Sequence, residues 1–276
     1  MERPTEVRIF DPDLEKQLNQ SLITPVSKIR EQKTKTMITL ARLTIGLLIA
    51  LLSTSCAFDI NIGSGKKGNG VVVKDRREVS EDFTAVYASE GLDVYVTQAE
   101  EFEITLEADE NVIDLIGTDI ADGRLKIHTL HNIGKATKKV FVSLPEITAL
   151  ETSSGADLIA NTVIEADRLS LDASSGSDLT LEVNADEVHA DTSSGADIKI
   201  SGRANVLYSS ASSGSDIRAR DLEVRTCVAE ASSGADIRVN VSDMLTADAN
   251  SGGDITYTGE PRLETTKSVS GSVRKE

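Results

Sequence analysis

Serine, glycine and aspartate recur together through the second half of the chain as Ser-Ser-Gly-x-Asp followed by Leu or Ile. The aspartates of these turns are Asp157, Asp178, Asp197, Asp216, Asp236 and Asp254. Oxygen ligands of this kind suit calcium, so a row of cation sites is one interpretation. The known glycine-aspartate calcium repeat has a nine-residue period that this chain lacks. We therefore favour a structural role, in which each carboxylate accepts hydrogen bonds from turn amides and serine hydroxyls, and keep the aspartates as weak metal candidates.

The sequence contains no recognisable catalytic motif. The histidines are His128, His131 and His189, and no cysteine lies near them. No Gly-x-Ser-x-Gly, phosphate-binding loop or dinucleotide fingerprint occurs. Since the acidic residues repeat in every period and do not gather at one place, we predict a non-enzymatic protein without a cofactor. The alternatives are a carbohydrate-active β-helix enzyme and a calcium-binding structural envelope protein.

The spacing of the turns predicts the fold. Their glycines, followed by Gly271, advance by 21, 19, 19, 20, 18 and 19 residues: Gly155, Gly176, Gly195, Gly214, Gly234 and Gly252. Apolar residues alternate on both sides of each turn, as strands facing a core do. We expect an all-β parallel β-solenoid with one coil of about 19–20 residues per repeat. The glycine at a fixed place in each repeat indicates a corner with positive φ, so we assign these glycines a structural role in the turn.

Residues 71–150 also alternate, but without the repeat. Strands are expected at 83–88, 92–96, 102–106, 125–128 and 139–144, with a short helical turn within 110–116. The segment Ala88 to Val94 resembles the later turns and predicts a first, degenerate coil. We therefore expect one continuous domain over 71–273, irregular over 71–150 and regular over 150–273.

The N-terminal residues resemble an export signal. Arg42, the apolar run Leu43 to Leu52 and the small residues Ser53 to Ser55 precede Cys56, as in a bacterial lipoprotein signal whose cysteine is lipidated. We predict a signal peptide or a membrane anchor over 37–55 and a flexible, glycine-rich tether over 56–70. Residues 1–36 would then be a non-native or cytoplasmic extension.

The composition limits the partners. A net charge of −16 and a pI near 4.7 argue against nucleic acid, because phosphates would be repelled. Aromatic residues make up only 3% of the chain, so an aromatic-lined pocket is not expected. We expect the chain to be attached to a membrane through a lipid anchor or its N-terminal segment. Its expected surface partner is a glycan or a protein.

Several of these segments together resemble one family. They are the leader ending in Cys56, Gly68-Asn69-Gly70, the strand Phe83 to Ala88, Gly91-Leu92-Asp93-Val94 and the repeated turns. The chain is similar over about 70–273 to the DUF2807 family, the head GIN domain of auto-transporter adhesins, although the tripeptide Gly-Ile-Asn does not occur. The resemblance implies a right-handed parallel β-helix on an exported bacterial protein and transfers no catalytic residues. We thus expect an adhesin-like lipoprotein of the cell envelope, on the outer membrane.

Overall fold

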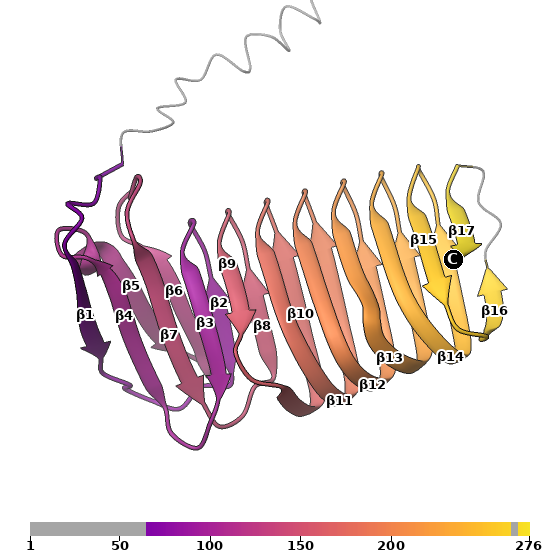
Figure 1. Ribbon diagram of the computed structural model, residues 1–276, viewed down its shortest axis with the longest axis horizontal. Helices are drawn as coiled ribbons and strands as arrows, with labels where there is room; N and C mark the ends of the chain where they lie inside the picture. Colours follow the sequence, from indigo (N-terminus) through magenta and orange to yellow (C-terminus); the bar gives the residue numbers. More distant parts are fainter. Residues whose placement is uncertain (1–64, 266–269) are drawn as a thin grey trace, which may run out of the picture. The chain divides into compact units, whose positions relative to one another are not determined.

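The computed structural model describes residues 65–265 and 270–276, which lie in one compact unit and are nearly all strand (Figure 1). The irregular first part contains β1 (Val72–Arg77), β2 (Ala85–Ala88), β3 (Asp93–Gln98), β4 (Glu103–Asp109), the 3-10 helix η1 (Ile113–Leu115), β5 (Ile116–Ala121), β6 (Arg124–Thr129) and β7 (Lys138–Leu144). The regular part contains β8 (Ala149–Thr152), β9 (Asp157–Ala160), β10 (Ile164–Ser174), β11 (Asp178–Ser193), β12 (Asp197–Ala211), β13 (Asp216–Ala231), β14 (Asp236–Ala249), β15 (Asp254–Thr258), β16 (Arg262–Thr265) and β17 (Ser272–Lys275).

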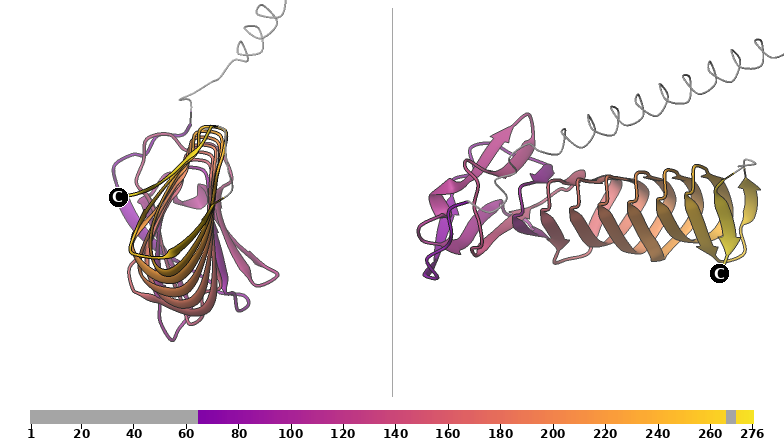
Figure 2. Two further views of the ribbon diagram at one scale, coloured as in Figure 1. Left: turned by 90° about the vertical axis from the view of Figure 1, so that its right-hand side faces the viewer. Right: turned by 90° about the horizontal axis from the view of Figure 1, so that it is seen from above.

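The regular part is the expected parallel β-solenoid. In each coil one long strand, such as β11 or β12, runs along a first sheet, bends, and returns along a second sheet (Figure 2). Equivalent residues of neighbouring coils pair in parallel, so Leu179 lies beside Ile198 and Ile198 beside Ile217. The stack in Figure 1 advances from left to right while near strands such as β15 run downward, which makes the coils right-handed.

The Ser-Ser-Gly turns form one edge of the stack. Positive φ was expected at the glycine and is confirmed, with φ between 68° and 80° at all six positions. The serine before each glycine also has positive φ, for example 57° at Ser175 and 56° at Ser194. The Gly176 N–H donates to the Ser194 carbonyl oxygen of the next coil at 3.1 Å. Two successive residues in the left-handed region are the central pair of a type I′ turn, which the Ala196 N–H closes by donating to the Ser193 carbonyl oxygen at 3.3 Å; this conformation costs a serine about 1–2 kcal/mol.

The period varies because neighbouring coils have extra residues at several points, one of them between Val224 and Thr226 in the pairing of β13 with β14. Pairing of β12 with β13 shifts register between Lys199 and Ser201, and pairing of β13 with β14 shifts between Ala219 and Glu223. β-Bulges of this kind insert residues without breaking the ladder on either side. The corners therefore remain aligned although the coils differ in length.

The segment Ala88 to Val94 is a coil of the stack, as the sequence indicated. Glu90 and Gly91 have φ of 64° and 68°, and Asp93 pairs with Asp157. After this coil the chain forms β4, which pairs antiparallel with the earlier β1 and with β7, and then the antiparallel pair β5–β6. Strands β6 and β7 lie on the other side of the coil, paired with β2 and β3. Strand β3 therefore lies between β7 and β9, two strands that come much later in the sequence.

Residues 65–70, the described part of the predicted tether, are hydrogen-bonded to the irregular first part of the domain, which we call the cap. The Gly68 N–H donates to the Lys135 carbonyl oxygen at 3.0 Å. The carboxylate of Asp109, which is buried, accepts hydrogen bonds from the N–H groups of Gly70 and Thr137. A flexible tether reaching residue 70 is therefore wrong. The rest of it, 56–64, lies outside the described residues, as do Cys56, the leader 37–55 and residues 1–36.

The interior is a single apolar core of Leu, Ile, Val and Ala that runs the length of the stack. Leu179, Ile198 and Ile217 are each at most 1% exposed. Within the ranges that the structure describes, no helix is long and apolar enough to cross a membrane.

Cys227 lies in this core, and burial raises the pKa of its thiol to about 12. Because the thiolate is the nucleophile, the folded protein is expected to resist alkylation at mildly alkaline pH. In a Cys56→Ala chain, where Cys227 is the only thiol, an alkylating reagent should react fully in denaturant and not in buffer. Reaction in buffer at the rate of a free thiol would contradict the burial of Cys227.

Candidate functional site

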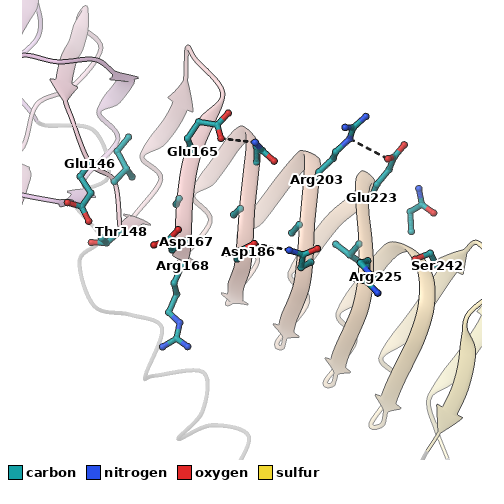
Figure 3. A pocket seen from close by; sticks show the side chains of 18 residues that line it. Glu146, Thr148, Glu165, Asp167, Arg168, Asp186, Arg203, Glu223, Arg225 and Ser242 are labelled. Carbon is teal, nitrogen blue, oxygen red and sulfur yellow. Dashed lines mark hydrogen bonds and ion pairs between the residues drawn. The ribbon is translucent and has the colours of Figure 1, made fainter.

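A groove of about 1090 Å³ lies along the edge opposite the Ser-Ser-Gly corners, where the strands bend from the first sheet to the second (Figure 3). It crosses five successive coils from β10 to β14. We call it the corner groove.

Small apolar residues form the floor of the corner groove. They stack in register from coil to coil: Ala166, Ala185, Ala204 and Val224. Ala185 and Ala204 are only 8% and 7% exposed. Side chains that point inward at a bend converge, so the close packing of protein interiors leaves room for small residues only. The polar neighbours on either side consequently stand higher than the floor.

Two polar rows form the walls. The first consists of Glu165, Asn184, Arg203, Glu223 and Asn240, each paired with the next coil. The second consists of Asp167, Asp186, Asn205, Arg225 and Ser242. Because adjacent coils are about 4.8 Å apart, the walls present hydrogen-bonding groups at a regular interval along the groove.

Interactions between coils fix these side chains. The Asn184 amide donates to the Glu165 carboxylate at 2.7 Å, and the Asn205 amide donates to Asp186 at 2.8 Å. Arg203 forms an ion pair with Glu223 at 3.6 Å (Figure 3). Each pair leaves further donors and acceptors facing solvent, since a guanidinium has five N–H groups and a carboxylate about four acceptor positions. The site can therefore bind a polar, extended ligand.

Sequence reasoning missed the corner groove. The signal is a polar-small-polar triplet about ten residues after each turn glycine, such as Asn184-Ala185-Asp186 and Arg203-Ala204-Asn205. Because alternation between inward and outward residues looks the same in a straight strand and at a bend, the pattern alone does not locate the bend.

The turn aspartates form the expected column on the first sheet, one at the start of each strand. We call Asp157, Asp178, Asp197, Asp216, Asp236 and Asp254 the aspartate column; each pairs in register with the next. Among the described residues no turn amide donates to these carboxylates, so that part of the prediction is wrong, whereas one serine hydroxyl, that of Ser272, donates to Asp254 at 2.7 Å. Four of the six carboxylates contact arginines on the same face of the sheet: Arg218 contacts both Asp197 at 3.0 Å and Asp216 at 2.7 Å, and Arg238 and Arg274 lie 3.8 Å from Asp236 and Asp254. These cations offset the repulsion between coils.

The carboxylates of the aspartate column stand in a row and do not converge on one point. Among the described residues, no three His, Cys, Asp or Glu side chains lie close enough together to hold a metal ion. His128 bonds to Asp119 at 2.6 Å, and His189 bonds to Glu187 and stacks on Tyr208.

A second acidic row precedes the turns on the second sheet, where Glu151, Asp172 and Asp191 pair from coil to coil. Partial burial raises the pKa of all three, and the charge of Asp172 raises the pKa of Asp191 further. A folded-state pKa above the unfolded value means that ionisation near neutral pH destabilises the fold, and that this cost disappears as the group is protonated.

Asp191→Asn is accordingly expected to raise the melting temperature near neutral pH, with a gain that shrinks as the pH falls to about 4, near the unfolded pKa of aspartate. Asp243→Asn is the opposite control, because hydrogen bonds from Ser242 and Arg225 lower the pKa of Asp243. That substitution should not raise the melting temperature at neutral pH. Thermal melts of the full chain from acidic to neutral pH measure both; a gain for Asp191→Asn that is independent of pH would contradict the electrostatic explanation.

The stack of parallel coils defines a β-solenoid, and comparisons with known proteins agree. The profile of the DUF2807 family, "Putative auto-transporter adhesin, head GIN domain", matches residues 82–261, and the chain belongs to this family. The family supports an adhesion or binding role. The comparison with curated proteins gave no match.

Solved structures show the same fold. A "putative adhesin" from Bacteroides fragilis is 17% identical with a TM-score of 0.70, over 77% of this chain and 100% of that one. A "putative adhesin" from Parabacteroides merdae is 21% identical with a TM-score of 0.62, over 76% and 98%. A "Putative lipid binding protein" from Parabacteroides distasonis is 19% identical with a TM-score of 0.64, over 76% and 98%.

Proposed function

We propose that the chain is a non-enzymatic, lipid-anchored adhesin of the bacterial cell envelope, and that its corner groove binds an extended glycan. Donors and acceptors repeated over five coils carry this proposal. A polysaccharide is itself a repeating chain of hydroxyl groups, so successive sugars meet equivalent wall residues in successive coils. The membership in an adhesin family supports a binding role in general.

The groove favours binding over cleavage. Glycosidases need one carboxylic acid and one carboxylate on opposite sides of a single bond. Here Glu165 and Asp186 each accept a hydrogen bond from an asparagine of the next coil, and Glu223 is paired with Arg203. These carboxylates hold neighbouring side chains in place and are repeated without a distinct centre.

A binding experiment tests the glycan. The purified full chain is applied to a panel of immobilised neutral and acidic polysaccharides, beside an Arg203→Ala/Asn205→Ala variant and Lys199→Ala as control. Arg203 and Asn205 face the groove, whereas Lys199 lies on the same coil outside it. We expect retention on at least one polysaccharide, about tenfold weaker in the groove variant, which corresponds to 1.4 kcal/mol. No retention, or equal retention by the groove variant, would overturn the proposal.

The anchor is tested separately. Lipidation at Cys56 would place the chain in the membrane fraction, and a leader cleaved before Cys56 supports this location. In a bacterial host that lipidates exported proteins, Cys56→Ala should move the chain to the soluble envelope fraction. A wild-type chain that fractionates with soluble cytoplasmic proteins would contradict the anchor.

A further inference from the structure

The outer face of the first sheet differs between its two halves. In the later coils, the row beside the aspartate column is basic and contains Lys199, Arg218, Arg238 and Arg274. Arg218 bridges Asp197 and Asp216, Arg238 lies 3.8 Å from Asp236, and Arg274 lies 3.8 Å from Asp254. The guanidinium of Arg218 thus lies between two carboxylates, and those of Arg238 and Arg274 each lie beside one.

In the earlier coils, uncharged and mostly apolar residues occupy the equivalent positions. Phe141, Tyr95, Ile159 and Thr180 continue the same row across β7, β3, β9 and β11, which lie side by side (Figure 1). The rings of Tyr95 and Phe141 stack with centroids 5.1 Å apart, and Ile159 is 40% exposed. This part of the sheet therefore presents an apolar strip to solvent.

The carboxylates beside this strip lack cationic partners. No ion pair involves Asp93, Asp157 or Asp178 within the described part of the chain, although Lys139 lies beside Asp93 in the register of β3 and β7, and Lys199 lies beside Thr180 in that of β11 and β12. Partial burial, and after it the charges of Asp178 and Asp93, raise the pKa of Asp157. We call Asp93, Asp157 and Asp178 with Phe141, Tyr95, Ile159 and Thr180 the bare aspartate face.

We propose that the bare aspartate face docks an arginine-bearing extended segment of a partner protein. A guanidinium lies between Asp157 and Asp178, as Arg218 lies between Asp197 and Asp216 in the same column, and its aliphatic stem covers Ile159 and the ring of Tyr95. Arginine fits better than lysine because its planar fork bonds two carboxylates at once and stacks on aromatic rings. The net charge of −16 attracts a basic partner over a distance.

Short fluorescent peptides in which arginine alternates with alanine test the proposal on the purified full chain. Peptides with lysine or citrulline in place of arginine have the same length, and citrulline removes the charge. The arginine peptide should bind about tenfold more tightly than the lysine peptide, the citrulline peptide should not bind, and added salt should weaken binding. Equal binding of the citrulline peptide would overturn the proposal, because the charge of arginine would then not contribute to binding.

A single substitution can place an arginine of the chain itself in the bare aspartate face, where it competes with the peptide. Thr180 stands in the register of Arg218, two residues after its aspartate, so Thr180→Arg places a guanidinium beside Asp178 and should abolish binding of the arginine peptide. Thr256→Arg is the matched control, because Thr256 lies in the same row between Arg238 and Arg274. Asp157→Asn/Asp178→Asn should weaken binding at least tenfold, with thermal melts showing that each variant is folded.

Unchanged peptide binding in folded Thr180→Arg and Asp157→Asn/Asp178→Asn would overturn the proposal. The groove variant Arg203→Ala/Asn205→Ala should bind the peptide like the wild type, because the corner groove and this face have no residue in common. A failure of the glycan proposal and a failure of the arginine proposal are therefore distinguishable.

Discussion

Gly202→Ala is expected to destabilise the solenoid by about 3–5 kcal/mol, within the range reserved for disrupted backbone packing. Gly202 has a φ of 103°, and a Cβ there would lie 2.0 Å from the carbonyl oxygen of Val183 in the neighbouring coil. Since the obstacle is backbone that is itself bonded into the ladder, neither coil can move aside without breaking its pairing. The substitution strains the φ angle and separates two coils at once.

Gly195→Ala is the matched control. Gly195 also has a positive φ, 72°, but no atom lies within 4 Å of the position of an added Cβ. Only the conformational cost of about 1–2 kcal/mol remains. Urea unfolding of both full-length variants measures the difference. Equal losses would contradict the close approach of the coils at Gly202.

Ile198→Ala is expected to cost about 2–5 kcal/mol, because it leaves a cavity in the core. Ile198 is fully buried between Leu179 and Ile217 of the adjacent coils. In a solenoid each coil contacts only its neighbours, so a cavity in one coil weakens two interfaces. Hydrogen exchange should accordingly increase first in β11, β12 and β13.

Lys199→Ala, one residue further along, is the control for this prediction. Lys199 points to the opposite face and is exposed, so its removal should change the free energy of unfolding by about 0.5 kcal/mol or less. Denaturant unfolding of the two variants compares the inward and outward positions of one strand. A larger loss for Lys199→Ala than for Ile198→Ala would contradict the assignment of the two faces.

The repeat made the regular coils predictable. Gly176, Gly195 and Gly214 occur at nearly constant spacing, and each occupies the same left-handed corner. The turn at Gly91 was predictable by the same resemblance. The order of coils in the cap was not, because the pairing of β3 with both β7 and β9 joins residues far apart in sequence, which local patterning does not encode.

The candidate sites were less predictable than the fold. The aspartate column was expected, but its partners were assigned to turn amides, whereas Arg218 and Arg238 bind it. Those arginines stand two residues after an aspartate, which places both on one face of a strand; the clue was present but not specific. The corner groove depends on where the strands bend, which only the three-dimensional structure shows.

The two proposed binding surfaces, the corner groove and the bare aspartate face, lie on different parts of the solenoid. The corner groove lies on the edge away from the Ser-Ser-Gly turns, and the bare aspartate face lies beside those turns on the earlier coils. A glycan in the first would leave the second accessible to a protein. Substitutions in one surface should therefore leave binding at the other unchanged.

Attachment of whole bacteria tests the adhesin proposal most directly. Cells producing the wild-type chain, Cys56→Ala or Arg203→Ala/Asn205→Ala are washed over a surface coated with the polysaccharide that retains the purified protein. We expect wild-type cells to attach, and both variants to attach about tenfold less, because one loses the anchor and the other the corner groove. Equal attachment by all three strains, with equal amounts of protein, would contradict adhesion through an anchored solenoid.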